Sequence, residues 1–244
     1  MPRANEMEQF NTPSNYQFSG ERVEDLGASE YTVCTLVTDI SGSVFSFKKE
    51  IEECQKKIIE SCQLSPRSDN LLFRSLGFNQ NLTELFGFRN LNSISLNEFD
   101  NYLYPSGSTA LYDSAYESIE SSVEYAKNLY NAGIAVNAIV FVITDGLDNA
   151  SKETPERIKN LLKSIIKKEE LESIRIILIG ITGGDKLTED GLKLFKDEAN
   201  LDQYVNIDQA DKKTLAKLAE FISKSISSQS AALGTGGPSK SLTF

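Results

Sequence analysis

Two long apolar runs place the strongest constraint on how this chain can fold. Residues 138–143 read AIVFVI and residues 174–181 read IRIILIGI, as expected for strands of a parallel sheet that is covered on both faces. Between them, Thr154 and Pro155 have the residue types of a helix N-cap and first helical position. Apolar residues then recur at helical spacing and are expected to face inward: Ile158, Leu161, Leu162, Ile165 and Ile166. This strand, helix and strand predict a parallel α/β unit.

The same alternation of strand-like and helical patterns continues over residues 31–226. Further strands are expected at 31–38 and 204–207, and further helices at 47–62, 110–131, from near 188 and from 211. The inner face of the helix at 110–131 is expected to carry Leu111, Ala115, Ile119, Val123 and Tyr130. The predicted fold class is a doubly wound, Rossmann-like α/β sheet with helices on both faces.

A hairpin pattern adds an antiparallel element to this sheet. Residues 71–78 and 82–88 are strand-like and are separated only by Asn79-Gln80-Asn81, which predicts an antiparallel pair at a sheet edge. The sheet is therefore expected to be mostly parallel with one antiparallel edge strand. Aromatic residues gather around the hairpin: Phe73, Phe78, Phe86, Phe88 and Phe99. Packing in the core or at the edge is the favoured interpretation, and an exposed docking strip is the alternative.

The chain of 244 residues is expected to form one folded domain. Residues 1–29 show no sustained period and are interpreted as an N-terminal extension, and 30–227 carry the domain. Residues 228–244 are small, polar and rich in Gly and Ser, which predicts a flexible C-terminal tail.

Composition excludes several classes of function. The chain has no histidine, so it lacks the usual general base, the Ser-His and Cys-His nucleophile pairs and histidine-based zinc sites. A net charge of −10, from 35 acidic and 25 basic residues, disfavours nucleic acid and anionic membranes as partners. Any metal here is expected to be bound through oxygen.

The expected compartment is the cytoplasm. No apolar stretch reaches the roughly 18 to 20 residues of a membrane span, and residues 1–9 are polar without an apolar signal core. Cys54 and Cys62 lie on one predicted helix about 12 Å apart, too far for a disulfide. All three cysteines are interpreted as reduced thiols.

Three oxygen-rich clusters follow predicted strands or precede a predicted helix. The first is Asp39-Ile40-Ser41-Gly42-Ser43, the second is Ser106-Gly107-Ser108-Thr109, and the third is Thr144-Asp145-Gly146. In doubly wound sheets, ligands bind beyond the carboxyl ends of the strands. If the strands ending at 38 and 144 are neighbours there, the clusters meet in one crevice. Two carboxylates and three hydroxyls suit Mg²⁺, with Mn²⁺ or Ca²⁺ as alternatives.

The three motifs together resemble the metal-ion-dependent adhesion site of von Willebrand factor A domains. The resemblance covers the core at 31–226 and rests on Asp39-x-Ser41-x-Ser43, Thr109 in a GST loop and Asp145 in a TDG turn. It implies direct metal binding by Ser41 and Ser43, direct or water-mediated binding by Thr109, and largely water-mediated roles for the two aspartates.

The resemblance also implies a function. A partner protein would complete the metal shell with an Asp or Glu, and no catalytic residue is expected. The chain is more similar to intracellular bacterial A domains that work beside ATPases, chelatases and kinases than to extracellular members, because it lacks a signal segment and disulfide-ready cysteines. Candidate partners are therefore an ATPase, a kinase or a phosphatase.

Other interpretations of the same residues stay open. Alone, the DxSxS segment fits a capped turn, and Asp148 and Asn149 fit ordinary turn formers. A Mg²⁺-dependent phosphohydrolase would use Asp39 as nucleophile or ligand. However, Ser41 stands where a second acid is expected, and Lys186, the candidate phosphate-binding lysine, lies in a predicted loop far along the chain with no supporting motif. A third alternative is a structural subunit whose metal only stabilises the fold.

Overall fold

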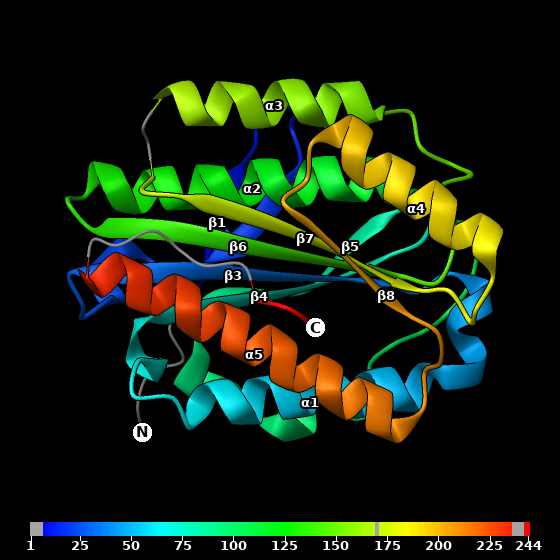
Figure 1. The fold of residues 1–244 in the computed structure, drawn as a ribbon. Coiled ribbons are helices and arrows are strands. Elements are labelled where there is room, and N and C mark those ends of the chain that lie inside the picture. The colour runs from blue at the N-terminus through cyan, green and yellow to red at the C-terminus, as the bar shows by residue number, and fades with distance from the viewer. Residues whose placement is uncertain (1–6, 169–170, 236–241) are drawn as a thin grey trace.

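A computed structural model describes residues 7–168, 171–235 and 242–244 (Figure 1). An eight-stranded sheet has the order β1-β2-β5-β4-β3-β6-β7-β8. Its strands are β1 (Glu8–Asn11), β2 (Gln17–Gly20), β3 (Glu30–Asp39), β4 (Leu71–Phe78), β5 (Leu82–Asn90), β6 (Ala135–Thr144), β7 (Ile174–Ile181) and β8 (Gln203–Ile207). The helices are α1 (Lys48–Gln63), α2 (Leu111–Asn131), α3 (Pro155–Lys168), α4 (Lys186–Ala199) and α5 (Lys212–Thr235).

Five strands run parallel and end at the same edge of the sheet. β3 pairs with β4 on one side and with β6 on the other, and β7 and β8 continue in the same direction. The register places Asp39 opposite Phe78 and Thr38 opposite Ile143. The carboxyl ends of β3 and β6 are therefore neighbours, which meets the condition under which the oxygen-rich clusters come together.

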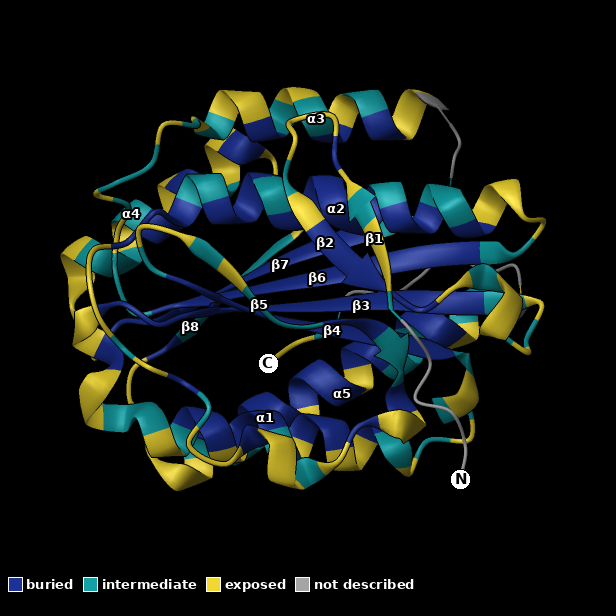
Figure 2. Cartoon of the chain, turned by 180° about the vertical axis from the view of Figure 1, so that it is seen from behind, coloured by how far each residue is buried: buried dark blue, intermediate teal, exposed yellow. Residues whose placement is uncertain are grey.

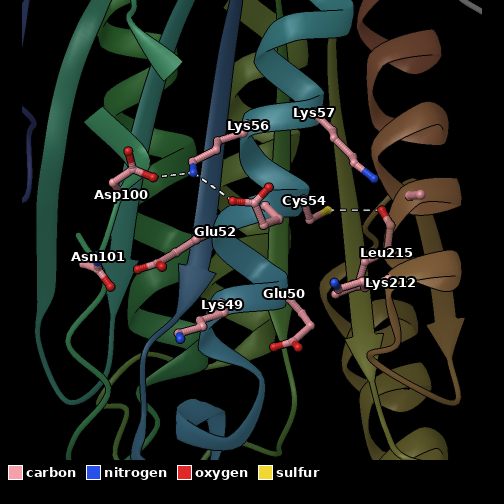
Figure 3. A pocket seen from close by; sticks show the side chains of 12 residues that line it. Lys49, Glu50, Glu52, Cys54, Lys56, Lys57, Asp100, Asn101, Lys212 and Leu215 are labelled. Atoms are coloured by element: carbon pink, nitrogen blue, oxygen red, sulfur yellow. Dashed lines mark hydrogen bonds and ion pairs between the residues drawn. The ribbon is translucent and has the colours of Figure 1, made fainter. Parts of the chain in front are cut away.

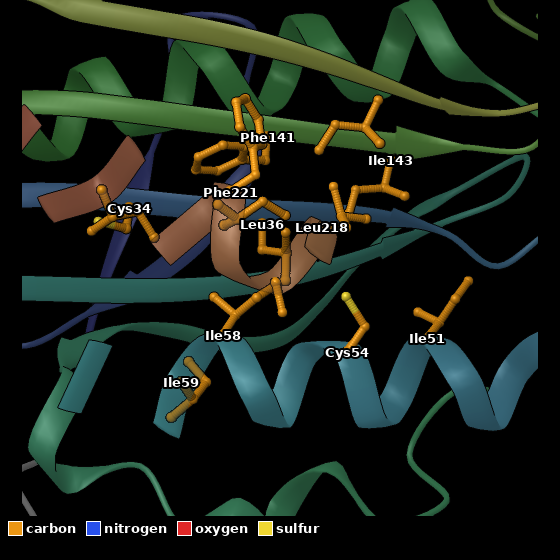
Figure 4. Close-up of a cluster of buried hydrophobic side chains, with 14 of the residues drawn as sticks. Cys34, Leu36, Ile51, Cys54, Ile58, Ile59, Phe141, Ile143, Leu218 and Phe221 are labelled. Carbon is orange, nitrogen blue, oxygen red and sulfur yellow. The ribbon is translucent and has the colours of Figure 1, made fainter. Parts of the chain in front are cut away.

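Helices cover both faces of this sheet (Figure 1). On one face α1 and α5 pack over a cluster that includes Cys34, Leu36 and Phe141 (Figure 4). On the other face, Val37 and Val140 pack beneath α2, α3 and α4. Alternate side chains of one strand thus enter opposite layers, and the central strands are buried throughout (Figure 2). The doubly wound α/β class is confirmed.

Two predicted helix starts can be checked against their caps. At α3 the backbone N–H of Arg157 donates to the Thr154 hydroxyl over 3.3 Å, as predicted for an N-cap. The next helix begins at Lys186, before the expected position near 188, because Asp185 accepts from the N–H of Leu187 at 3.3 Å and of Thr188 at 3.1 Å.

Two side chains expected on inner helix faces point to solvent instead. Ile166 is 71% exposed and Tyr130 is 51% exposed. Each lies in the last turn of its helix, and its neighbour in the chain, Leu129 on α2 or Ile165 on α3, takes the buried position instead. The hairpin aromatics, by contrast, pack inside: Phe73, Phe78, Phe88 and Phe99 are buried, and the partly buried Phe86 packs against Phe73 and Phe99.

The N-terminal region is more ordered than the sequence predicted. Residues 7–29, expected as an extension, contain β1 and β2, which form an antiparallel pair, and Gly20 of β2 bridges to Phe88 of β5. β5 is antiparallel to β4 as predicted, but it is not the edge strand because this pair lies outside it. Short strands of four residues carry too little periodicity to be recognised in the sequence.

A buried arginine joins this N-terminal pair to the sheet. Arg74 on β4 is fully buried and its guanidinium forms an ion pair with Glu84 at 2.8 Å. The same group donates to the Tyr16 hydroxyl at 3.1 Å and lies 5.1 Å from the centre of the Phe18 ring. Glu84 in turn accepts from the backbone N–H of Ser19 at 3.0 Å. The charge network thus fixes β2 against β4 and β5.

The predicted C-terminal tail also begins too early. Helix α5 runs to Thr235 instead of stopping before residue 228. Asn137 Nδ2 donates to the Gln229 carbonyl over 2.7 Å, so this part of the helix packs on β6. Residues 236–241 lie outside the described part, while the Leu242 carbonyl accepts from Gln203 Nε2 at 2.9 Å.

Two further expectations concern thiols and membranes. Cys34, Cys54 and Cys62 are buried and are not joined in a disulfide, in agreement with the expectation of free thiols. Within the described residues, no helix is both long enough and apolar enough to cross a bilayer.

Candidate metal centre

Asp39 is held at the junction of two neighbouring strands. It is the last residue of β3 and is only 1% exposed. One carboxylate oxygen, Oδ1, accepts from the backbone N–H of Ser41 at 2.7 Å. The other, Oδ2, accepts from the hydroxyl of Thr144, the last residue of β6, at 2.7 Å. The carboxylate therefore has a fixed position at the carboxyl edge of the sheet.

A chain of hydroxyls connects the first loop to the third. The Ser41 and Ser43 hydroxyl oxygens lie 3.0 Å apart, and the Ser43 hydroxyl donates to Asp145 Oδ1 over 2.9 Å. Ser41 is buried, whereas Ser43 faces solvent. Four of the five predicted ligands therefore form one hydrogen-bonded group that reaches the surface.

Thr109 is brought to this group by backbone contacts. The Ser106 N–H donates to the Ile40 carbonyl at 2.8 Å, and the Gly42 N–H donates to the Gly107 carbonyl at 3.2 Å. Gly107 has φ +81°, a left-handed conformation that favours glycine. The Thr109 hydroxyl forms no hydrogen bond to any described residue. All five predicted residues thus lie on loops that are joined to one another.

Burial makes the two carboxylates costly to ionise. Desolvation raises the pKa of Asp39, although hydrogen bonds from Thr144 and Ser41 oppose the rise. Desolvation also raises the pKa of Asp145 to about 6, and the nearby charge of Asp39 adds to this shift. A cation between them would stabilise both ionised forms.

The donor set fits a hard divalent cation. Among the described residues, no group of three or more His, Cys, Asp and Glu could hold a metal, so a site here needs other oxygen donors besides carboxylates. Asp39 and Asp145 supply carboxylates, while Ser41, Ser43 and Thr109 supply neutral oxygens. Such oxygen ligands suit Mg²⁺, Mn²⁺ or Ca²⁺ better than a soft metal.

The loop after Asp145 has a larger role than turn formation. Asn149 and Thr109 form a reciprocal pair: the Thr109 N–H donates to Asn149 Oδ1 at 2.8 Å and the Asn149 N–H donates to the Thr109 carbonyl at 2.9 Å. Asp148 Oδ1 accepts from the N–H of Leu111 at 2.9 Å. These two residues thus place Thr109 and the start of α2.

The capping role of Asp148 is connected with a feature of the sequence before α2. Helix α2 begins after Ala110, which has no side chain that can cap a helix. Its first N–H groups therefore need acceptors from elsewhere. Asp148 and the Ser151 hydroxyl, which accepts from Tyr112 at 3.0 Å, provide them.

We expect Asp148→Ala to lower the free energy of unfolding by about 1–2 kcal/mol, as for the loss of an N-cap. Urea denaturation monitored by circular dichroism would measure the change. Asp190→Ala, which removes an exposed aspartate of α4, is the matched control and should shift the midpoint little. Equal stability of the two variants would show that Asp148 does not cap α2.

A separate cavity lies outside these loops, between α1 and α5 (Figure 3). It has a volume of about 560 Å³ and is lined by charges of both signs. Lys56 is ion-paired there with Glu53 at 2.8 Å and with Asp100, and Cys54 Sγ donates to the Leu215 carbonyl at 3.4 Å. None of the five predicted ligands lines this cavity.

Comparisons with known proteins bear on the fold. No protein-family model and no curated protein match the chain. Among solved structures, a D319A mutant of the PilB minor pilin from Streptococcus sanguinis aligns with a TM-score of 0.60 at 16% identity, over 89% of this chain and 66% of that one. The pilus adhesin SpaC from Lactobacillus rhamnosus GG aligns with a TM-score of 0.55 at 12% identity, over 82% of this chain and 31% of that one.

A third solved structure is described as having a metal-ion-dependent adhesion site (MIDAS). Proximal thread matrix protein 1 from the mussel byssus, with a zinc-occupied MIDAS motif, aligns with a TM-score of 0.51 at 20% identity, over 80% of this chain and 45% of that one. The fold is that of von Willebrand factor A domains. The chain spans less than two thirds of each of these three proteins, and at such low identity the likeness establishes the fold alone.

Proposed function

We propose that this chain is a protein-interaction module that holds one divalent cation and uses it to bind a carboxylate of a partner. The observation that carries the proposal is the connected group of Asp39, Ser41, Ser43 and Asp145 at the carboxyl edge of an A-type fold. Only two of the five oxygen donors are carboxylates, and Ser43 is open to solvent. A cation held there retains affinity for a further anionic oxygen from outside.

The proposed ion is Mg²⁺, with Mn²⁺ and Ca²⁺ as alternatives, because hard cations prefer oxygen donors. The zinc-occupied motif of the mussel protein supports a divalent ion at this place in the fold. Ser41 and Ser43 would bind the ion directly, and Thr109 directly or through water. Asp39 and Asp145 would balance its charge. They also fix the two serines, because Asp39 accepts from the backbone N–H of Ser41 and Asp145 accepts from the Ser43 hydroxyl.

The proposed role is binding without catalysis. The chain has no histidine, and Ser41 stands where a phosphotransfer site would place a second acid. Lys186, the candidate phosphate-binding lysine, is ion-paired with Glu189 at 3.2 Å at the start of α4. Turnover of p-nitrophenyl phosphate that depends on Asp39 would contradict this part of the proposal.

We further propose that the module belongs to the intracellular bacterial type of A domain and works in the cytoplasm. Its three free, buried cysteines support a reducing compartment. The partner would be a protein that presents Asp or Glu, and an ATPase, kinase or phosphatase is the proposed class. Nucleic acid and membrane surfaces are not proposed as partners, given the net charge of −10.

Affinity capture from host lysate tests the bridging role. The purified chain would be used in Mg²⁺, in EDTA and as Asp39→Asn, with Asp190→Asn as an exposed control on α4. A partner captured only in Mg²⁺, by the wild type and the control, is the expected result. Identical captures under all conditions, with a melting temperature that still rises with Mg²⁺, would reduce the ion to a structural role.

A further inference from the structure

Large apolar side chains are exposed on the loops around the candidate metal centre. Phe45 is 74% exposed, Tyr104 is 76% exposed, Leu147 is 36% exposed and Leu187 is 75% exposed. They follow β3, precede α2, follow β6 and follow β7, respectively. Each therefore lies at the carboxyl edge of the parallel strands, which is also the edge that carries the metal centre.

Short-range connections keep three of them close to the predicted ligands. Phe45 lies two residues after Ser43, and Leu147 lies two residues after Asp145. Tyr104 lies two residues before Ser106, whose N–H donates to the Ile40 carbonyl between Asp39 and Ser41. Lys48 Nζ also lies 5.5 Å from the centre of the Tyr104 ring, so the first and second loops are in contact.

Helix α4 extends the apolar surface on the side of the third loop. A Cβ placed on Gly191 would lie 2.6 Å from Leu147 Cδ2, so the glycine leaves the room in which the Leu147 side chain packs. Leu187 lies four residues before Gly191 and thus on the same face of α4. Leu147, which lies two residues after Asp145, and Leu187 are thus both placed along the face of α4 that carries Gly191.

The position of these residues distinguishes them from ordinary exposed apolar side chains. Single exposed apolar residues are normal on any protein. Five others of the described chain are exposed. Leu64, Tyr130 and Ile166 sit singly at the C-terminal ends of α1, α2 and α3, at the opposite edge of the sheet, while Leu194 lies on α4 and Phe244 follows α5. At the metal edge, by contrast, four are contributed by separate segments of the chain: three lie on the loops that carry the predicted ligands, and Leu187 lies at the start of α4.

We propose that this surface binds a peptide segment of the partner in which an Asp or Glu is flanked by large apolar residues. The inference rests on the proposed function, because the bound cation is the group that would bind the Asp or Glu carboxylate of the segment. Apolar residues of the segment would cover Phe45, Tyr104, Leu147 and Leu187 and remove water from around the ion and carboxylate. Exclusion of water strengthens the attraction between the two charges.

A selection from displayed peptides tests the inference. Short random peptides around a fixed Asp or Glu would be bound to the immobilised full chain in Mg²⁺, eluted with EDTA and sequenced. The test variant is Phe45→Ser/Leu187→Ser, and the matched control is Leu64→Ser/Ile166→Ser, which removes equally exposed side chains from the opposite edge. The Mg²⁺-dependent rise in melting temperature would show that each variant is folded and binds metal.

The expected result is enrichment of large apolar residues beside the fixed acid for the wild type and the control, and loss of that enrichment for the test variant. A selected peptide should bind the test variant about tenfold or more weakly in fluorescence anisotropy. EDTA-eluted peptides without apolar enrichment would overturn this inference and leave the proposed function standing. If no peptide is eluted by EDTA, the proposed function fails and this inference fails with it.

Discussion

Asp39→Asn is expected to abolish divalent-cation binding, with a loss of affinity of about a hundredfold or more, while the chain stays folded. The substituted amide keeps the size of the side chain and an oxygen that can accept from the Ser41 N–H. The change removes one of only two carboxylates in the centre. At about 100 times the dissociation constant, Mg²⁺ should stabilise the wild type by about 2.7 kcal/mol. Thermal unfolding with and without Mg²⁺ would show this gain, and the variant should show none.

Asp208→Asn is the matched control for this experiment. Asp208 is an exposed aspartate just after β8, at the same edge of the sheet, and it accepts from Asn206 Nδ2 at 2.9 Å. This variant should keep the full response to Mg²⁺. A response of Asp39→Asn equal to that of the wild type would place the metal elsewhere.

Arg74→Ala is expected to cause the largest loss of stability, about 3 kcal/mol, because it removes a fully buried cation from its ion pair with the partly buried Glu84. The change leaves Glu84 without its cation and removes the group that lies against Tyr16 and Phe18. Urea denaturation would measure the loss. Hydrogen exchange should show faster exchange of the Ser19 amide, because the Glu84 acceptor is no longer fixed.

Two comparison variants show how much of the effect of Arg74→Ala comes from the burial of the arginine and how much from the unpaired charge of Glu84. Arg157→Ala removes an exposed arginine that pairs with Glu153 at 3.0 Å, and it should lower stability far less than Arg74→Ala, because water screens an exposed ion pair. Arg74→Met with Glu84→Gln removes both charges and should be more stable than Arg74→Ala. Similar losses for Arg74→Ala and Arg157→Ala would show that the buried pair does not hold the N-terminal strands.

The parts of the fold that sequence predicted well are those with long, regular patterns. β4 and β7 have the predicted bounds, and β6 and α2 differ from prediction only at their ends. These elements are buried on defined faces, so the periodicity of apolar residues reports their structure directly. The five predicted ligands could be chosen because each follows or precedes such an element at the same edge of the sheet.

The parts that sequence did not predict depend on contacts between distant residues. β1 and β2 are short, and they are held by Arg74 and by Tyr125, whose hydroxyl donates to the Glu21 carbonyl at 2.9 Å. Asp148 and Asn149 look like turn formers until α2 is seen to lack a cap of its own. Such long-range partners leave no periodic signal in the local sequence.

The measurement that tests the central claim most directly is an anomalous difference map from crystals grown with Mn²⁺, which scatters anomalously and can replace Mg²⁺ at oxygen sites. We predict one strong peak at coordination distance from the Ser41 and Ser43 hydroxyls, beside Asp39 and Asp145, with a position left for an external oxygen. A map without a peak there, or with Mn²⁺ bound only at exposed carboxylates elsewhere, would contradict the account.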